Sequence, residues 1–231
     1  MSVLALVPAY QAARTVERVV ADLTERFVGE PGVLVVDDGS TDETADVARR
    51  AGARVVRHPG NRGKGAALRT GLAWARSWGA DSVVTVDADG QHPADEAWRI
   101  AAYPAPRAAL VLGVRDLASA GAPPSSRFSN ALSNSFLSRF GGTRLCDTQC
   151  GLRRYPVSET LELGAWADGF AYEAEVVLRA ARAGHSIVQV PVRVTYPAPA
   201  ERLSHFHVVR DPARIVLTVL STLATTARPR V

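Results

Sequence analysis

Two carboxylates that follow a buried strand are the residues whose types and spacing most clearly suggest chemistry. Asp87 and Asp89 come directly after the apolar run at residues 83–86, which is typical of a strand covered on both faces of a parallel sheet. An isolated buried carboxylate is unfavourable, but at the carboxyl end of a strand a divalent cation can lie between the two groups. Oxygen ligands suit Mg²⁺ or Mn²⁺, commonly shared with substrate phosphates. The pair therefore predicts a metal site that holds a nucleotide diphosphate.

A third carboxylate stands in a similar place. Asp38 follows the apolar run at residues 33–36 and precedes a glycine turn, so it can accept hydrogen bonds from a base or a ribose. Residues 40–42 can also cap the helix that follows, and one capping residue suffices. We expect only a capping role for Asp42, whereas nucleotide binding and a plain strand–turn–helix junction both stay open for Asp38.

Lys64 is the only lysine among 27 basic residues. It lies between Gly63 and Gly65 at the predicted start of a helix, where backbone N–H groups favour anions. The abundance of arginine can reflect coding bias, but a lone lysine then marks a place that needs a compact point charge. The spacing is not that of a Walker phosphate loop. We expect Lys64 to lie near the nucleotide.

The elements that must position these residues alternate in type. Strand-like runs lie at residues 3–7, 33–36, 53–57, 82–86 and 108–113, and helical patterns lie at residues 15–27, 42–51, 65–78 and 94–103. This alternation predicts an α/β fold, with a single Rossmann-like, mostly parallel sheet and helices on both faces. Ligands of such folds bind beyond the carboxyl ends of the strands, where the carboxylates fall.

The pattern changes after residue 113. We expect a loop at residues 118–126, a helix at 127–140 and an irregular piece at 141–155. A second helix should follow at residues 170–183, then a strand pair or one bent strand at 187–196, and a last helix at 211–227. The last helix has a broad apolar stripe and flanking arginines. Packing on the domain, a dimer contact and peripheral membrane contact are equally compatible with that stripe.

Composition narrows the class of protein. The chain has 231 residues, a net charge of +4 and 47% hydrophobic residues, which suits one α/β domain or one domain with a small appendage. Only 6% of the residues are aromatic, and no nucleic-acid-binding module is recognisable. The sequence shows neither the features of a signal peptide nor an apolar run long enough to span a membrane, so we expect a cytoplasmic protein. Cys146 and Cys150 are expected to be reduced structural residues.

Taken together, these motifs resemble glycosyltransferase family 2 on the GT-A fold. The resemblance is carried by LVPAY, VVDDGSTDET, NRGKGAALRTGL and VDADGQHP. The later motifs LGVR, DTQCGLRRY and FAYEAEVVLRAARAG are similar to the branch that transfers sugars to polyprenyl or dolichyl phosphate. The resemblance implies a GT-A domain over residues 1–210, with a donor half (1–113) and an acceptor half (114–210), followed by a C-terminal amphipathic helix (211–231).

The resemblance also implies donor-side roles. The nucleotide would be bound by Pro8, Ala9, Tyr10, Asp38, Lys64, Asp87, Ala88 and Arg202. Mg²⁺ or Mn²⁺ would be held by Asp87, Asp89, Gln91 and His205. Asp89 is the central metal ligand, while Asp87 approaches the ribose or the metal. For His205, an ordinary polar histidine is the alternative.

On the acceptor side, Arg115 and Arg127 match positions that hold a phosphate, with solvated surface arginines as the alternative. A phosphate acceptor is largely dianionic at neutral pH and needs no general base, whereas a hydroxyl acceptor needs one. Glu173 is the candidate base, and an equally good interpretation is that it pairs with an arginine. We expect Asp147, in the DTQCG motif, to make structural hydrogen bonds.

The sequence therefore predicts an inverting, metal-dependent glycosyltransferase. It would move a hexose from a UDP- or GDP-linked sugar to a polyprenyl phosphate, with catalytic residues Asp89, Arg115, Arg127 and Glu173. The alternatives are the same donor chemistry with a hydroxyl acceptor on a glycan or small molecule, and a non-catalytic nucleotide-sugar-binding module. A sugar nucleotidyltransferase would carry a phosphate-binding loop after the first strand, which residues 8–11 do not form. The oligomeric state is left open.

Overall fold

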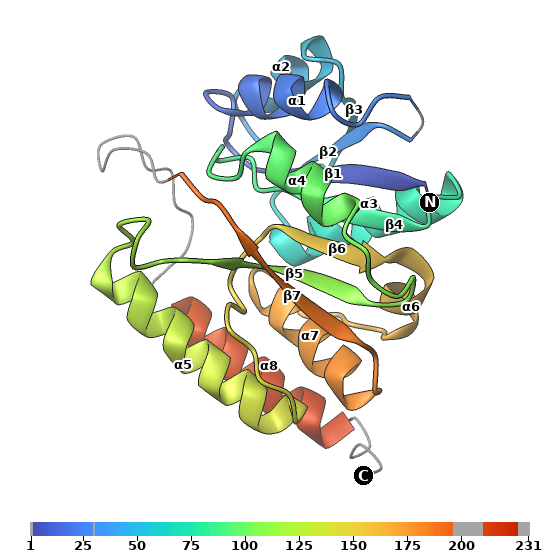
Figure 1. The fold of residues 1–231 in the computed structure, drawn as a ribbon. Helices are drawn as coiled ribbons and strands as arrows, with labels where there is room; N and C mark the ends of the chain where they lie inside the picture. The colour runs from blue at the N-terminus through green and yellow to red at the C-terminus, as the bar shows by residue number, and fades with distance from the viewer. Residues whose placement is uncertain (1, 30, 196–209, 226–231) are drawn as a thin grey trace.

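One mixed sheet forms the centre of the molecule (Figure 1). The computed structural model describes residues 2–29, 31–195 and 210–225. Within them, the strands are β1 (Val3–Ala9), β2 (Val33–Asp37), β3 (Arg54–Arg57), β4 (Ser82–Thr85), β5 (Leu110–Arg115), β6 (Arg153–Pro156) and β7 (Ile187–Val192). Their order is β3-β2-β1-β4-β6-β5-β7. Only β6 among these strands runs antiparallel to its neighbours, β4 and β5, so the expected mostly parallel sheet is confirmed.

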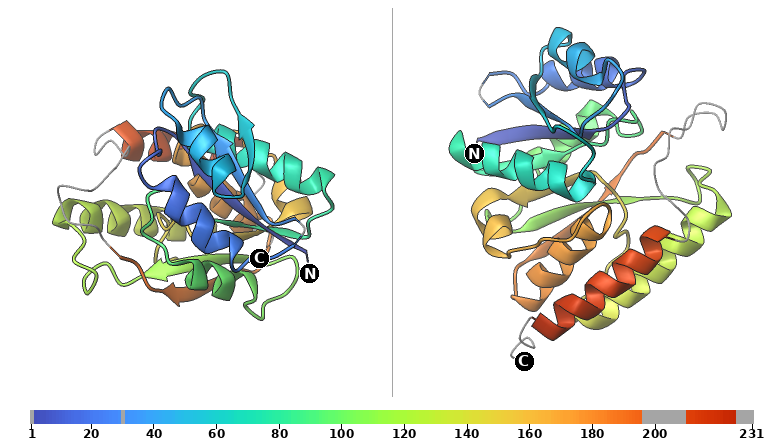
Figure 2. Two further views of the ribbon diagram at one scale, coloured as in Figure 1. Left: turned by 90° about the horizontal axis from the view of Figure 1, so that it is seen from above. Right: turned by 180° about the vertical axis from the view of Figure 1, so that it is seen from behind.

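Helices cover both faces of this sheet, as the alternating pattern predicts (Figure 2). One face packs against α1 (Val16–Thr24), α2 (Thr44–Arg50) and α4 (Ala94–Ala101). The other packs against α3 (Lys64–Ser77), α6 (Val157–Glu162) and α7 (Ala171–Arg182). Because both faces are covered, β1 is apolar and is buried after Val3, while β2 is apolar up to Asp37 and is buried throughout.

Two further helices form an outer layer. α5 (Pro124–Gly141) and α8 (Arg210–Thr225) lie side by side and pack against α7 (Figures 1 and 2). Leu137 of α5, Val219 of α8 and Leu178 of α7 share one apolar cluster. The last helix expected from the sequence is thus present and packs on the domain.

Two expectations for the second half need correction, and one alternative is decided. The piece expected to be irregular contains β6, which inserts between β4 and β5. Two arginines in β6 conceal the strand from a hydropathy pattern, but both guanidinium groups are buried and donate to backbone carbonyls. β5 runs to Arg115, so this arginine lies on the strand and not after it. Of the two alternatives for residues 187–196, the structure shows a single strand, β7 over residues 187–192, which tolerates Pro191 because it lies at the sheet edge.

Candidate active site

The carboxylate pair lies at the carboxyl end of β4, as expected. Lys64 Nζ is 2.7 Å from Asp87 Oδ1, and the Asp87 side chain keeps 30% of its surface exposed. Asp89 Oδ1 accepts a hydrogen bond from the backbone N–H of Gln91. Burial, followed by the neighbouring Asp87 carboxylate, raises the pKa of Asp89 to about 6. Burial also disfavours the charged form of Asp87, but the Lys64 ammonium outweighs it and lowers the pKa of Asp87.

Lys64 also joins the two halves of the chain. Its Nζ is 2.9 Å from Glu173 Oε2, near the start of α7. Burial alone would lower the pKa of Lys64, but the carboxylates of Asp87 and Glu173 raise it, so the side chain carries a firm positive charge. Gly65 permits this approach, because a Cβ there would lie 2.6 Å from the Ala167 carbonyl oxygen.

Glu173 is buried and faces a second cation. Arg153 Nε lies 3.7 Å from Glu173 Oε1, and the Arg153 side chain is fully buried. An arginine thus lies beside Glu173, as the alternative interpretation expects, but the hydrogen-bonding partner of its carboxylate is Lys64. The four groups alternate in sign, from Arg153 through Glu173 and Lys64 to Asp87.

Asp38 organises the loop that leads to Lys64. Its carboxylate accepts hydrogen bonds from the backbone N–H groups of Arg62 and Gly63 and lies 2.7 Å from His58 Nδ1. The residue is only 3% exposed. These partners give Asp38 a structural task, and they hold Gly63 in the left-handed conformation (φ 86°) from which α3 starts.

The end of β1 lies beside this loop. Pro8 and Ala9 are buried and pair in register with Val36 and Asp37 of β2, while Tyr10 is partly exposed just beyond. The next residue, Gln11, has a positive φ of 50° and donates its backbone N–H to Ser40 Oγ. The structure thus brings the three residues predicted for the base pocket to the same edge as Asp38.

The two acceptor-side arginines differ in their surroundings. Arg115 makes an ion pair with Asp147, with Nε 2.7 Å from Oδ2 and Nη2 3.0 Å from Oδ1. The structural role expected for Asp147 is confirmed by this pair and by the bond from the Arg115 backbone N–H. Arg127 lies exposed in the first turn of α5. The structure therefore fixes the Arg115 guanidinium and leaves the Arg127 side chain at the surface.

The described residues offer a hard divalent cation a small number of oxygen ligands, which leaves positions for water or for substrate phosphates. No group of three His, Cys, Asp or Glu side chains with metal-binding geometry occurs in the described part of the chain. Asp89 beside Asp87, with the Gln91 amide, offers two carboxylates at most. Mg²⁺ commonly binds in this way, through one or two carboxylates and substrate phosphates.

Arg202 and His205 lie outside the described residues. The segment that leads toward them is held close to the carboxylates, because the Thr195 backbone N–H donates to the Gln91 carbonyl oxygen. Arg193, two residues earlier, pairs with the buried Glu96 of α4.

Sequence reasoning missed two residues that touch this site. Gly151 packs on the Asp87 carboxylate, and Arg153 holds the loop that contains Gly151. Both belong to the DTQCGLRRY motif, but only the antiparallel pairing of β4 with β6 brings that motif beside Asp87.

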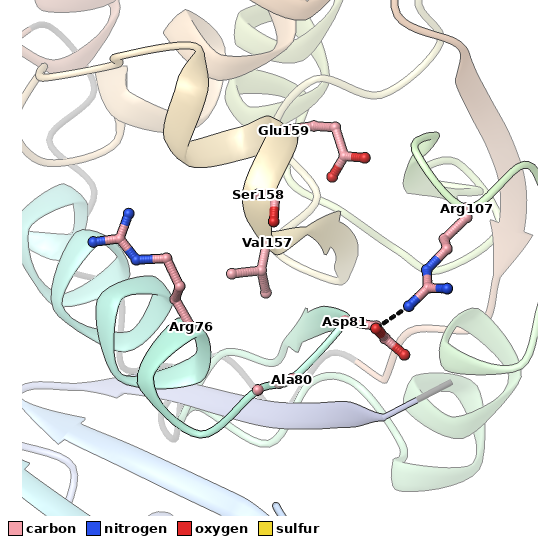
Figure 3. Close-up of a pocket in the computed structure, with 8 residues that line it drawn as sticks. Arg76, Ala80, Asp81, Arg107, Val157, Ser158 and Glu159 are labelled. Carbon is pink, nitrogen blue, oxygen red and sulfur yellow. Dashed lines mark hydrogen bonds and ion pairs between the residues drawn. The ribbon is translucent and has the colours of Figure 1, made fainter.

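A pocket of about 270 Å³ lies near the start of β4 and of α6, at the end of β4 opposite to the carboxylates (Figure 3). Arg107 pairs there with Asp81, and Arg76 lines the wall. None of the residues predicted for the active site lines this pocket.

The fold and the acidic edge of the sheet define a GT-A glycosyltransferase. Residues 5–158 match the family described as Glycosyl transferase family 2, so the chain belongs to this family. It is 31% identical to an undecaprenyl-phosphate mannosyltransferase of Micrococcus luteus, over 83% of this chain and 83% of that protein. It is 29% identical to a dolichyl-phosphate hexose transferase of Haloferax volcanii, over 85% and 84%.

A similar fold is found in glucosyl-3-phosphoglycerate synthase from Mycobacterium tuberculosis, solved in complex with Mn²⁺, UDP and phosphoglyceric acid. The TM-score is 0.72 at 23% identity, over 96% of this chain and 78% of that chain. The expected fold and the expected family are therefore confirmed, and the family makes the chain an enzyme rather than a binding module.

Proposed function

We propose that this glycosyltransferase is metal-dependent and inverting, and that it moves a hexose from a nucleotide diphosphate sugar to a polyprenyl phosphate. The observation that carries the proposal is the pair Asp87 and Asp89 at the end of β4, with the Lys64 ammonium against it. The similarity to enzymes named for undecaprenyl-phosphate and dolichyl-phosphate acceptors supports the acceptor class.

On the donor side, Asp89 and Gln91 would hold Mg²⁺ or Mn²⁺, with Asp87 beside them and His205 as a further ligand. The metal ion, when bound, neutralises charge on the departing nucleoside diphosphate. Pro8, Ala9 and Tyr10 would line the base pocket. Asp38 would act by shaping this edge, because its carboxylate is occupied by the loop at residues 58–63.

The sugar diphosphate would lie between the metal site and the arginines. Ala88 separates the two carboxylates, and Lys64 and Arg202 would supply positive charge to the diphosphate. Asp87 and Glu173 already neutralise the charge of Lys64. Lys64 would therefore attract the diphosphate through the local positive charge of its ammonium group, and not through a net positive charge of the cluster.

On the acceptor side, Arg127 would bind the phosphate. Arg115, which is held in place by Asp147, would lie at the edge of the phosphate site. A dianionic phosphate attacks without losing a proton, and a single displacement inverts the anomeric centre. The surroundings of Glu173 favour a phosphate acceptor. Its carboxylate is paired with Lys64 and lies beside Arg153, which makes it a weak general base, and a phosphate acceptor needs none. A hydroxyl acceptor is the second candidate, with Glu173 as the base, since Glu173 shares its partner Lys64 with the donor-side Asp87.

The apolar stripe of α8 supports peripheral contact with a membrane. Leu217 and Leu220 of α8 and Phe128 and Leu132 of α5 are exposed. No described helix is long and apolar enough to span a bilayer. A polyprenyl chain dissolved in lipid would then meet the enzyme at this face.

A thermal-shift screen of UDP-, GDP- and dTDP-sugars with Mn²⁺ or Mg²⁺ tests the donor site. A ligand that binds only the native state raises the unfolding temperature according to its affinity. We expect one nucleotide to stabilise the wild type only with a metal ion, and Asp89→Asn to lose this response. If no nucleotide stabilises the wild type, or if Asp89→Asn responds equally, the donor-site assignment is wrong.

Transfer of a radiolabelled sugar tests the acceptor. With undecaprenyl phosphate we expect label in the organic phase, and with undecaprenol none. The anomeric configuration of the product, read by NMR, tests inversion.

A further inference from the structure

Gly151 lies directly against the Asp87 carboxylate. β6 runs antiparallel to β4, with Thr85 opposite Arg153, and continuing this register by two residues places Gly151 opposite Asp87. A Cβ built on Gly151 would lie 2.1 Å from Asp87 Oδ2. No side chain fits in that space without moving the carboxylate or the loop.

Two independent contacts hold Gly151 in this place. Thr85 Oγ1 donates to the Gly151 carbonyl oxygen at 2.7 Å, which fixes the loop to β4. The buried Arg153 guanidinium donates to the carbonyl oxygens of Cys150 and Thr148, at 2.7 and 2.6 Å. The loop therefore meets Asp87 as a braced surface.

Asp87 is consequently confined from two sides. Gly151 touches Oδ2, and Lys64 Nζ binds Oδ1 at 2.7 Å. Lys64 belongs to the donor half and Gly151 to the acceptor half. A donor-side carboxylate is thus in contact with a loop from the acceptor half.

We propose that Gly151 is a positioning residue of the donor site, whose missing side chain lets the loop at residues 148–151 close on Asp87 and orient its carboxylate. The inference rests on the proposed function, because it assigns Asp87 a task in holding the metal ion with Asp89. Residues that orient metal ligands typically change affinity by about 10- to 100-fold when substituted.

Gly151→Ala tests the contact without any ligand. The added methyl group should lower the unfolding temperature when it is introduced into the wild type. The decrease should be much smaller in an Asp87→Ala background, because the carboxylate that the methyl group would meet is then absent. Gly71→Ala is the matched control, because its methyl group would lie 2.4 Å from Leu6 in the core. Its effect should be the same in both backgrounds. Equal losses for Gly151→Ala in the two backgrounds would overturn the proposed contact.

Binding of Mn²⁺ alone, followed by the free-ion signal in electron paramagnetic resonance, tests positioning. We expect Gly151→Ala to bind Mn²⁺ at least tenfold more weakly than the wild type, and Gly71→Ala to bind it normally. In the Asp87→Ala background, Gly151→Ala should have no further effect. If Gly151→Ala is unstable, Thr85→Val, which removes the hydroxyl that braces the loop, should weaken Mn²⁺ binding several-fold.

The two ways of failing are distinguishable. A wild type that binds no Mn²⁺ overturns the proposed metal site, and this inference with it. Normal Mn²⁺ binding by both Gly151→Ala and Thr85→Val overturns the positioning role alone.

Discussion

At the scale of single residues, Lys64 connects carboxylates that are far apart in the sequence. Its ammonium lies 2.7 Å from Asp87 and 2.9 Å from Glu173, in a pocket that leaves 14% of its side chain exposed. A compact charge suits this place, since a planar guanidinium presents its donors in a wider fork. The lone lysine of the sequence is thus explained by its two partners.

Glu173→Gln separates the two acceptor classes. With a phosphate acceptor, we expect kcat to fall less than about tenfold, because glutamine keeps the size of the side chain and a bond to Lys64. Loss of a general base would instead lower kcat by about 10²- to 10⁴-fold. Steady-state kinetics with each acceptor give the answer.

Glu175→Gln is the control for this variant. Glu175 is also buried, and it accepts from the backbone of Trp166 and Ala167 and from Arg179 rather than from Lys64. A fall of 10²-fold or more in Glu173→Gln, with normal nucleotide binding and a mild effect of Glu175→Gln, would contradict the phosphate acceptor.

The pH dependence of metal binding follows from Asp89. Burial and the adjacent Asp87 raise the pKa of Asp89 to about 6. Above pH 6 the carboxylate is ionised and can bind a cation, whereas below pH 6 the metal ion must displace a proton. We expect the affinity for Mn²⁺ to be constant above about pH 7 and to fall by up to about tenfold per pH unit below 6.

Titration calorimetry between pH 5 and 8 measures this fall. His92, whose pKa burial lowers to about 4, stays neutral over that range and contributes no step. An affinity independent of pH across the range would contradict a metal ligand that titrates near pH 6.

At the scale of elements, α5 and α8 present one partly apolar outer face. Phe128 and Leu217 are 72% and 66% exposed. α5 carries two arginines and no acidic residue, and residues 114–231 contain 14 arginines but nine acidic residues. Such a face is suited to the surface of an anionic membrane.

The double variant Phe128→Gln/Leu217→Gln should lose most of its binding to vesicles that contain phosphatidylglycerol. Transfer to a short-chain, water-soluble acceptor should stay unchanged, because neither side chain lies among the predicted site residues. Co-sedimentation at low and high salt measures the effect, and salt should weaken wild-type binding.

Val28→Gln is the control, since Val28 is 83% exposed and follows α1, away from α5 and α8. Equal vesicle binding by the double variant and the control would contradict membrane contact through α5 and α8.

At the scale of the whole molecule, the donor and acceptor halves share one sheet. β6, from the acceptor half, lies between β4 and β5 of the donor half, so neither half has a complete sheet alone. The apolar clusters on each face also draw on both halves, as with Leu72 and Val176.

We therefore expect a single cooperative unfolding transition. Leu72→Ala in the donor half and Val176→Ala in the acceptor half should each shift that transition as a whole, Leu72→Ala by about 2–5 kcal/mol. Urea unfolding followed by circular dichroism and by tryptophan fluorescence should give coincident curves. Separate transitions, with each substitution moving only one of them, would show that the halves fold independently.

The sequence by itself determined the succession of the first four strands and helices along the chain, and the acidic residues that follow the second and the fourth strand. These features depend on local periodicity and on residue types at strand ends, which neighbouring residues encode. Asp87, Asp89 and Asp38 were therefore found without a structure. The strand β6 was not, because its two arginines break the apolar pattern and their burial depends on carbonyl groups supplied by distant segments.

Only the tertiary structure decided which groups meet at the site. It showed Lys64 between Asp87 and Glu173, Asp147 on Arg115, and Gly151 against Asp87. Each contact joins segments from different parts of the chain, and an antiparallel insertion sets the register that brings Gly151 to Asp87. Such pairings depend on long-range packing. The pattern along the chain therefore indicates which reactive residue types are present, while the packing determines which of them contact one another.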